Sequence, residues 1–109
     1  SLEIAPDDPN SWYLYGSCLN ELGRYFSDQE IYRQAIEKFQ YGLSLTRNHP
    51  LLWYGLALAN FSVGELTEQK AYFEKAVRYC SRVIECGGGG FPQFWNDWGV
   101  ALLKLAEYS

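Results

Sequence analysis

The amino-acid sequence predicts an all-α protein of about five helices that pair as antiparallel hairpins. Apolar residues recur at intervals of three and four, which is the period of one face of an α-helix. No stretch of useful length alternates apolar and polar residues, so the sequence predicts no strand. Trp12, Trp53 and Trp95 lie 41 and 42 residues apart, each three residues after a proline. A near-constant period of this size indicates a repeat architecture.

The first hairpin is predicted from an apolar face that begins after Pro9. Its first helix covers roughly residues 10–22, and Gly23 is expected to end it. The second helix covers roughly residues 28–46. Ser27 and Glu30 fit a capping box, in which the Ser hydroxyl accepts an early backbone N–H and the Glu reaches back.

The second hairpin begins after Pro50. Its first helix is predicted over residues 51–62, with Gly64 ending it. Its second helix is predicted over residues 66–86, starting at Leu66 or Thr67.

The last predicted helix covers residues 93–107. Gly87 is expected to close the preceding helix in the left-handed conformation that glycine favours. The glycines that follow, Gly88–Gly90, are expected to form a loose connector.

Composition excludes several classes of protein. The chain has 109 residues, of which 48% are hydrophobic, so it is not a disordered tail. No apolar run approaches the length that spans a bilayer, and we expect no membrane contact. The net charge is −4 and the sequence has no Lys/Arg cluster, so we expect no nucleic-acid partner, because phosphate neutralisation dominates that affinity. The chain contains no Met, and we expect it to be an excised piece of a longer array.

The repeated segments resemble the tetratricopeptide repeat, a helix–turn–helix unit of 34 residues. The resemblance implies an open, right-handed α-α superhelix of helical hairpins, with the three repeat tryptophans buried between neighbours. The spacings exceed the family length by 7 and 8 residues, and we place the excess in lengthened second helices. The matching positions are Trp12, Gly16, Leu19, Gly23, Ala35 and Phe39, then Trp53, Leu56, Ala57, Gly64, Phe73 and Ala76, then Trp95, Gly99, Ala101 and Leu102.

The resemblance also implies a division of the chain into repeats. Residues 1–8 would be the tail of an upstream repeat, and residues 9–49 a repeat with an insertion. Residues 50–91 would form a repeat with an extended second helix, and residues 92–109 the first helix of a further repeat.

In this family the first helices line a concave groove that binds partner peptides, which implies a non-catalytic interaction scaffold. Residues one, five and eight positions after each tryptophan share a helical face and are the expected groove residues. The alternative is that some of them fill space against a neighbouring helix. They are Tyr13, Ser17, Asn20, Tyr54, Leu58, Phe61, Asn96, Val100 and Leu103.

The chemistry of these positions favours an apolar or amphipathic partner, either a helix or an extended segment. One subfamily grips a terminal carboxylate with Lys, Arg and Asn side chains. None of the five corresponding positions carries the required residue, so this clamp is not expected. They are Tyr13, Ser17, Leu58, Gln93 and Asp97.

The cysteines, the glycine run and the histidine do not form a recognisable reactive site. Cys80 and Cys86 would lie about 9 Å apart along one helix, too far for a disulfide, and no histidine accompanies them at zinc spacing. The glycine run lacks the Lys-Ser or Lys-Thr of a phosphate loop, and His49 lies in a turn. We therefore expect no catalytic residue, metal or cofactor. Free thiols favour a reducing compartment, the cytoplasm.

Two other functions stay open. The chain could be a structural spacer or a self-association module, with Trp98, Leu102 and Leu105 forming a homodimer through the last helix. It could also be the targeting domain of an enzyme whose active site lies elsewhere in a longer protein.

Overall fold

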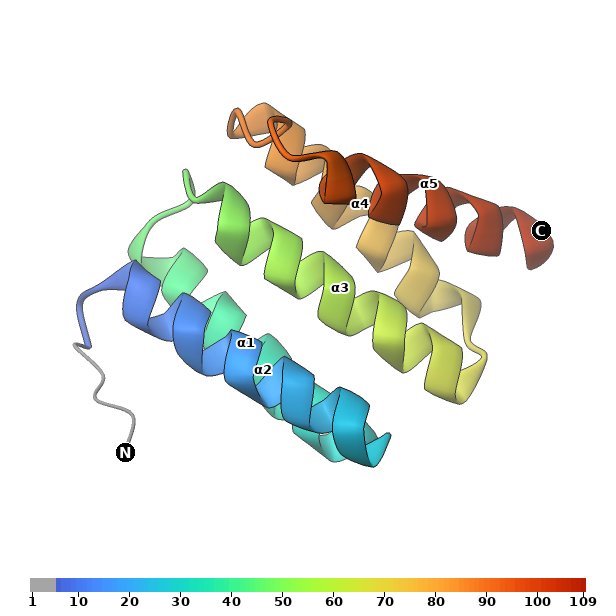
Figure 1. The fold of residues 1–109 in the computed structure, drawn as a ribbon, viewed down its shortest axis with the longest axis horizontal. Helices are drawn as coiled ribbons and strands as arrows, with labels where there is room; N and C mark the ends of the chain where they lie inside the picture. Colours follow the sequence, from blue (N-terminus) through green and yellow to red (C-terminus); the bar gives the residue numbers. More distant parts are fainter. Residues whose placement is uncertain (1–5) are drawn as a thin grey trace.

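The computed structural model describes residues 6–109, which form five helices without a strand. The predicted all-α fold is confirmed (Figure 1). Residues 1–5 of the expected upstream tail lie outside the described residues. The helices are α1 (Pro9–Phe26), α2 (Gln29–Leu45), α3 (Pro50–Thr67), α4 (Lys70–Glu85) and α5 (Pro92–Glu107).

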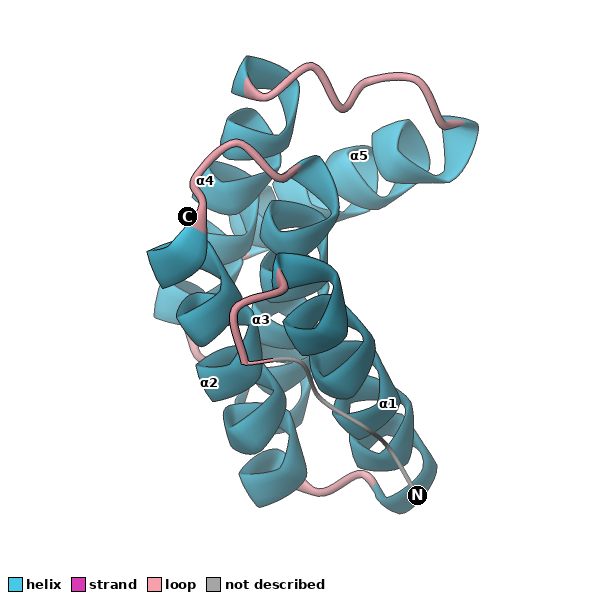
Figure 2. Cartoon of the chain, turned by 90° about the vertical axis from the view of Figure 1, so that its left-hand side faces the viewer, coloured by secondary structure: helices cyan, strands magenta, loops and turns pink. Residues whose placement is uncertain are grey.

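The helices stack as consecutive hairpins. The α1–α2 and α3–α4 pairs make the most extensive contacts, α2 packs on α3, and α4 packs on α5. α3 also contacts both α1 and α5. Figure 2 shows α1 and α2 at one end of the stack, α4 and α5 at the other, and α3 between them. Because α3 contacts both α1 and α5, these first helices form one layer, and the second helices α2 and α4 form the other.

Three helices begin in the same way. Pro9, Pro50 and Pro92 each occupy the first turn, where a proline costs no hydrogen bond and its fixed φ suits the helix. Three residues later, each tryptophan donates its indole N–H to a backbone carbonyl six residues earlier in the chain. The bonds run from Trp12 to Pro6 at 3.1 Å, from Trp53 to Arg47 at 2.9 Å, and from Trp95 to Gly89 at 2.8 Å.

The core is organised around aromatic rings that pack against glycines. Phe39 of α2 is fully buried between α1 and α3. A Cβ added at Gly16 would lie 2.6 Å from its ring, and a Cβ at Gly55 would lie 2.5 Å from it. Such distances are far below van der Waals contact, so both helices approach the ring where they have no side chain. Tyr32 meets Gly23 in the same way.

The predicted ends of α1 and α3 were wrong. α1 continues through Gly23 to Phe26, and α3 continues through Gly64 to Thr67. Both glycines lie inside a helix because an aromatic ring of the next helix occupies the space of a side chain. The helices end instead where a non-glycine residue turns left-handed, Ser27 with φ 50° and Glu68 with φ 55°.

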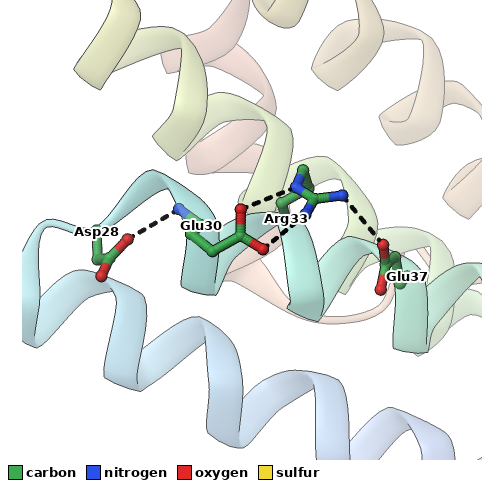
Figure 3. Close-up of polar contacts among 4 residues, drawn as sticks. All are labelled: Asp28, Glu30, Arg33 and Glu37. Carbon is green, nitrogen blue, oxygen red and sulfur yellow. Dashed lines mark hydrogen bonds and ion pairs between the residues drawn. The ribbon is translucent and has the colours of Figure 1, made fainter.

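The start of α2 differs from the predicted capping box. Ser27 ends α1 in the left-handed conformation, so it cannot also begin α2. Asp28 is the N-cap, and its Oδ1 accepts the backbone N–H of Glu30 at 2.9 Å. The Glu30 side chain pairs with Arg33 at 2.7 Å, and Arg33 also reaches Glu37 at 3.3 Å (Figure 3).

The second hairpin also divides differently from the prediction. α4 begins at Lys70 rather than near residue 66, and α3 is 18 residues long against 16 for α4. The residues between Gly64 and Thr67 therefore belong to the first helix of the hairpin. The boundaries of α2 and α5 agree with the prediction to within a residue.

The connector to α5 is packed rather than loose. Gly87 has φ 80°, which confirms it as the left-handed residue after α4. Gly88, however, is buried, and a Cβ there would lie 2.5 Å from Cβ of Pro50 and 2.7 Å from Cγ1 of Val83. The missing side chain of Gly88 lets the backbone lie directly on Pro50 at the start of α3.

The three tryptophans are not equally buried. Trp53 is buried as predicted and Trp12 is half-buried, but Trp95 is 49% exposed, so its predicted burial was wrong. Phe94 takes the fully buried position at the start of α5, which turns the adjacent Trp95 ring outward.

Gly55→Ala tests the ring-and-glycine packing. Alanine is the better helix former by roughly 1 kcal/mol. We expect it to lower the free energy of unfolding by about 1–3 kcal/mol all the same, because its Cβ would overpack the Phe39 ring. Urea unfolding followed by circular dichroism measures the change. Gly99→Ala in α5 is the matched control, since a Cβ there meets nothing within 4 Å, and it should stabilise. A stabilising Gly55→Ala would contradict this account.

Candidate protein-binding site

The nine expected groove residues all lie in the layer of first helices, on α1, α3 and α5. They form two groups with different surroundings. The residues of α3 and α5 meet around a shared apolar hollow and a polar contact. The residues of α1 form a separate, half-buried group.

Leu58, Phe61 and Val100 line one small cavity of about 40 Å³ between α3, α4 and α5. Alanines of these helices, together with Cys80 and Asp97, complete its wall. Leu58 and Phe61 are half-buried, and Val100 is 38% exposed. Leu103, one turn beyond Val100, is 67% exposed. The α3–α5 part of the face is therefore an apolar surface that is only partly covered.

Tyr54 fills space and also makes a polar contact. Its ring packs on Phe91 and Phe94, with ring centroids 5.3 Å and 5.6 Å away. Its hydroxyl donates a hydrogen bond to Asp97 of α5. Burial, followed by this bond, raises the pKa of the Tyr54 hydroxyl well above its ordinary value. Tyr54 thus ties α3 to α5, which fits the space-filling alternative for this residue.

Asp97 is the polar residue that the groove prediction missed. It accepts from Tyr54, and its other oxygen accepts from Nε2 of Gln93 at 3.1 Å. Its charge also acts on the nearby thiol of Cys80. Burial, and then the negative charge of Asp97, raise the pKa of Cys80 from 9.0 to about 12. The sequence offered no signal for this contact, because Tyr54 and Asp97 are far apart in the chain.

The α1 group packs toward the core. The ring of Tyr13 contacts those of Phe39 and His49, each with centroids 6.3 Å apart. Ser17 and Asn20 are half-buried. The Oδ1 atom of Asn20 is buried without a hydrogen-bond partner in the described part of the chain. Asn96 of α5, by contrast, is exposed.

The outer side of α5 presents a second apolar surface. Trp95, Trp98, Gly99 and Leu102 line an open hollow of about 300 Å³. The two indole rings stack at 5.6 Å, and Leu102 is 47% exposed. Trp98 and Leu105 are half-buried. The residues expected to pair in a homodimer therefore lie on one side of one helix.

The remaining candidate chemistry is limited. All three cysteines are free. No group of three or more candidate metal ligands comes together in residues 6–109. His49 caps α3, since its Nδ1 accepts the N–H of Leu52 at 3.3 Å. Among the described helices, none has both the length and the apolar character needed to cross a membrane.

Residues 51–82 match the family model of the tetratricopeptide repeat. The α3–α4 hairpin is therefore similar to a tetratricopeptide repeat. The match extends from the start of α3 nearly to the end of α4 and includes six of the positions that carried the resemblance, from Trp53 to Ala76. No curated protein and no solved structure gives a significant match to the chain.

The helices around the matched hairpin are consistent with this similarity. The five packed helices fit part of an array of such repeats, with α1 and α5 beside the first helix of the matched unit. Tetratricopeptide repeats generally mediate protein–protein interactions and are typically non-catalytic. The assignment of residues 9–49 and 92–109 to flanking repeats stays a prediction.

Alkaline pH should destabilise the fold through Cys80 and Tyr54. In the unfolded chain the Cys80 thiol loses its proton near pH 9.0, whereas the folded protein keeps it to about 12. The unfolded state therefore binds fewer protons in this window, and the free energy of unfolding falls as pH rises from about 9 to about 12. Urea unfolding at stepped pH measures this slope. Cys80→Ala should show a shallower slope, and an equal slope would contradict the role of the thiol.

Proposed function

We propose that the chain is a non-catalytic interaction scaffold that binds a partner peptide or helix on the face formed by α1, α3 and α5. The observation that carries this proposal is the partly covered apolar surface of Leu58, Phe61 and Val100, which continues to the exposed Leu103. An apolar side chain of a partner would cover this surface and remove it from water, which favours binding.

The partner is an apolar or amphipathic segment. Asp97, the carboxylate beside the cavity, is already hydrogen-bonded by Tyr54 and Gln93. Both of its oxygens are therefore already engaged, and the rest of the cavity lining is apolar apart from the Cys80 thiol. The exposed amide of Asn96 can bond a partner backbone, which supports an extended or helical peptide over a small ligand.

A peptide selected from a random display library against the chain provides the test. We expect an amphipathic sequence that shifts the amide resonances of α3 and α5 around Leu58, Asn96 and Val100. Val100→Asp should weaken its binding by about tenfold or more, because a partner would then bury a charge. Fluorescence anisotropy measures the affinity.

Leu45→Asp is the matched control, because Leu45 is 39% exposed on α2, outside the proposed face, and the substitution introduces the same charge. It should leave the affinity unchanged. Circular dichroism confirms that both variants are folded. Selected peptides whose resonance shifts fall on α2 and α4, or whose binding ignores Val100→Asp, would overturn the groove proposal.

Self-association is the second candidate, and the open hollow at Trp95, Trp98 and Leu102 favours it. A partner copy could cover these residues and bury the exposed indole of Trp95. Sedimentation equilibrium should then give a dimer mass that Leu102→Glu reduces to the monomer mass. A monomer at all accessible concentrations would exclude this function for the chain alone.

A further inference from the structure

A hollow lies between α2 and α4, on the side of the molecule away from the proposed binding face of α1, α3 and α5. Its volume is about 420 Å³, its lining comes from α2, α3, α4 and Arg47, and it is open to solvent. The floor is apolar, with Leu43, Trp53 and Leu56, and the rim carries three arginines, Arg47, Arg78 and Arg82. Neither the repeat pattern nor the expected groove includes these arginines.

The backbone and the core hold two of the arginines in place. The carbonyl of Arg47 accepts the indole N–H of Trp53 at 2.9 Å and the thiol of Cys86 at 3.3 Å. The base of the Arg47 side chain is therefore tied to both α3 and α4. The guanidinium of Arg82 lies over the Trp53 ring, 6.0 Å from its centroid. The contact with Trp53 orients the Arg82 guanidinium, which reduces the entropy that a ligand would have to remove on binding, whereas for Arg47 only the backbone is fixed.

The described chain neutralises the positive charge of this hollow only in part. Four ion pairs join side chains within residues 6–109, and none includes Arg47 or Arg78. Arg82 pairs with Glu85 at 2.9 Å, but that pair is exposed. The two arginines that lie outside the hollow are both paired with carboxylates. In a chain of net charge −4, three of the nine basic residues thus gather at one site.

We propose that this hollow binds an acidic peptide segment of a partner protein, in which carboxylates flank an apolar side chain. The carboxylates would accept charge-assisted hydrogen bonds from Arg47, Arg78 and Arg82, whose planar guanidinium groups suit that geometry. Arg78 and Arg82 are one helical turn apart, so one segment can reach both. The apolar side chain would rest on Leu43 and Leu56.

The apolar residues at the floor of the hollow favour a peptide over a small anion as the ligand. Free phosphate would use the guanidinium groups but gain nothing from the apolar residues beneath them. A nucleic acid would meet three cations on an acidic protein, whereas its binding depends on neutralising many phosphates. An acidic peptide with an apolar residue uses both the rim and the floor.

A fluorescein-labelled peptide of sequence Glu-Leu-Glu-Glu-Leu-Glu is the probe, and its Gln-for-Glu version is the chemical control. We expect fluorescence anisotropy to show salt-sensitive binding of the acidic peptide and much weaker binding of the Gln version. Arg78→Glu should weaken binding by about tenfold or more, because it places a like charge against the ligand. The Arg78 side chain is exposed and makes no ion pair within residues 6–109, so the substitution should not disturb the fold.

Arg24→Glu is the matched control, because it makes the same charge change on an exposed residue of α1. Its affinity should stay close to wild type, with unchanged circular dichroism in both variants. Equal weakening by Arg24→Glu would show a general charge effect and overturn the site. So would equal binding of the Gln peptide, full displacement by inorganic phosphate at low concentration, or no binding of the acidic peptide. Val100→Asp should leave this binding intact, which separates the hollow from the face of α1, α3 and α5.

Discussion

The ring of Phe39 is held between two helices that have no side chain where they touch it. Gly16 of α1 and Gly55 of α3 both meet the Cδ1, Cε1 and Cζ atoms of the ring, and any larger residue at either place would displace the ring or the helix. The ring belongs to α2, so a single side chain sets the distances among three helices. Because α3 then positions α4 and α5, the layered arrangement depends on this contact.

This constraint explains where sequence reasoning succeeded and where it failed. The helical period and the tryptophan spacing predicted the number and order of helices, since these depend on local apolar patterns. Gly23 and Gly64 were interpreted as helix ends because an isolated glycine more often stops a helix than fills one. Their role depends on Tyr32 and Phe73 of the following helices, a tertiary contact that no local pattern encodes. The residues that do end those helices, Ser27 and Glu68, have no special propensity for a left-handed conformation.

The candidate site was also predicted only in part. The resemblance placed Leu58, Phe61 and Val100 on one face, and the structure brings them to one cavity. It did not reveal that the Tyr54 hydroxyl is already bonded to Asp97, because that bond joins residues of two different hairpins. The sequence did not predict the arginine hollow for a similar reason. Arg47 and Arg82 are separated by a whole hairpin, so their charges look dilute along the chain although they share one site in space.

Trp53 connects the two sides of the molecule. Its indole N–H fixes the carbonyl of Arg47, its ring lies under Arg82, and its burial anchors the start of α3. The same helix carries Leu58 and Phe61 on the face of the first-helix layer. One helix thus forms the floor of an arginine-lined hollow and part of an apolar surface on opposite sides. Because the two surfaces differ in charge and share no lining residue, an apolar segment and an acidic segment could bind at the same time without competing.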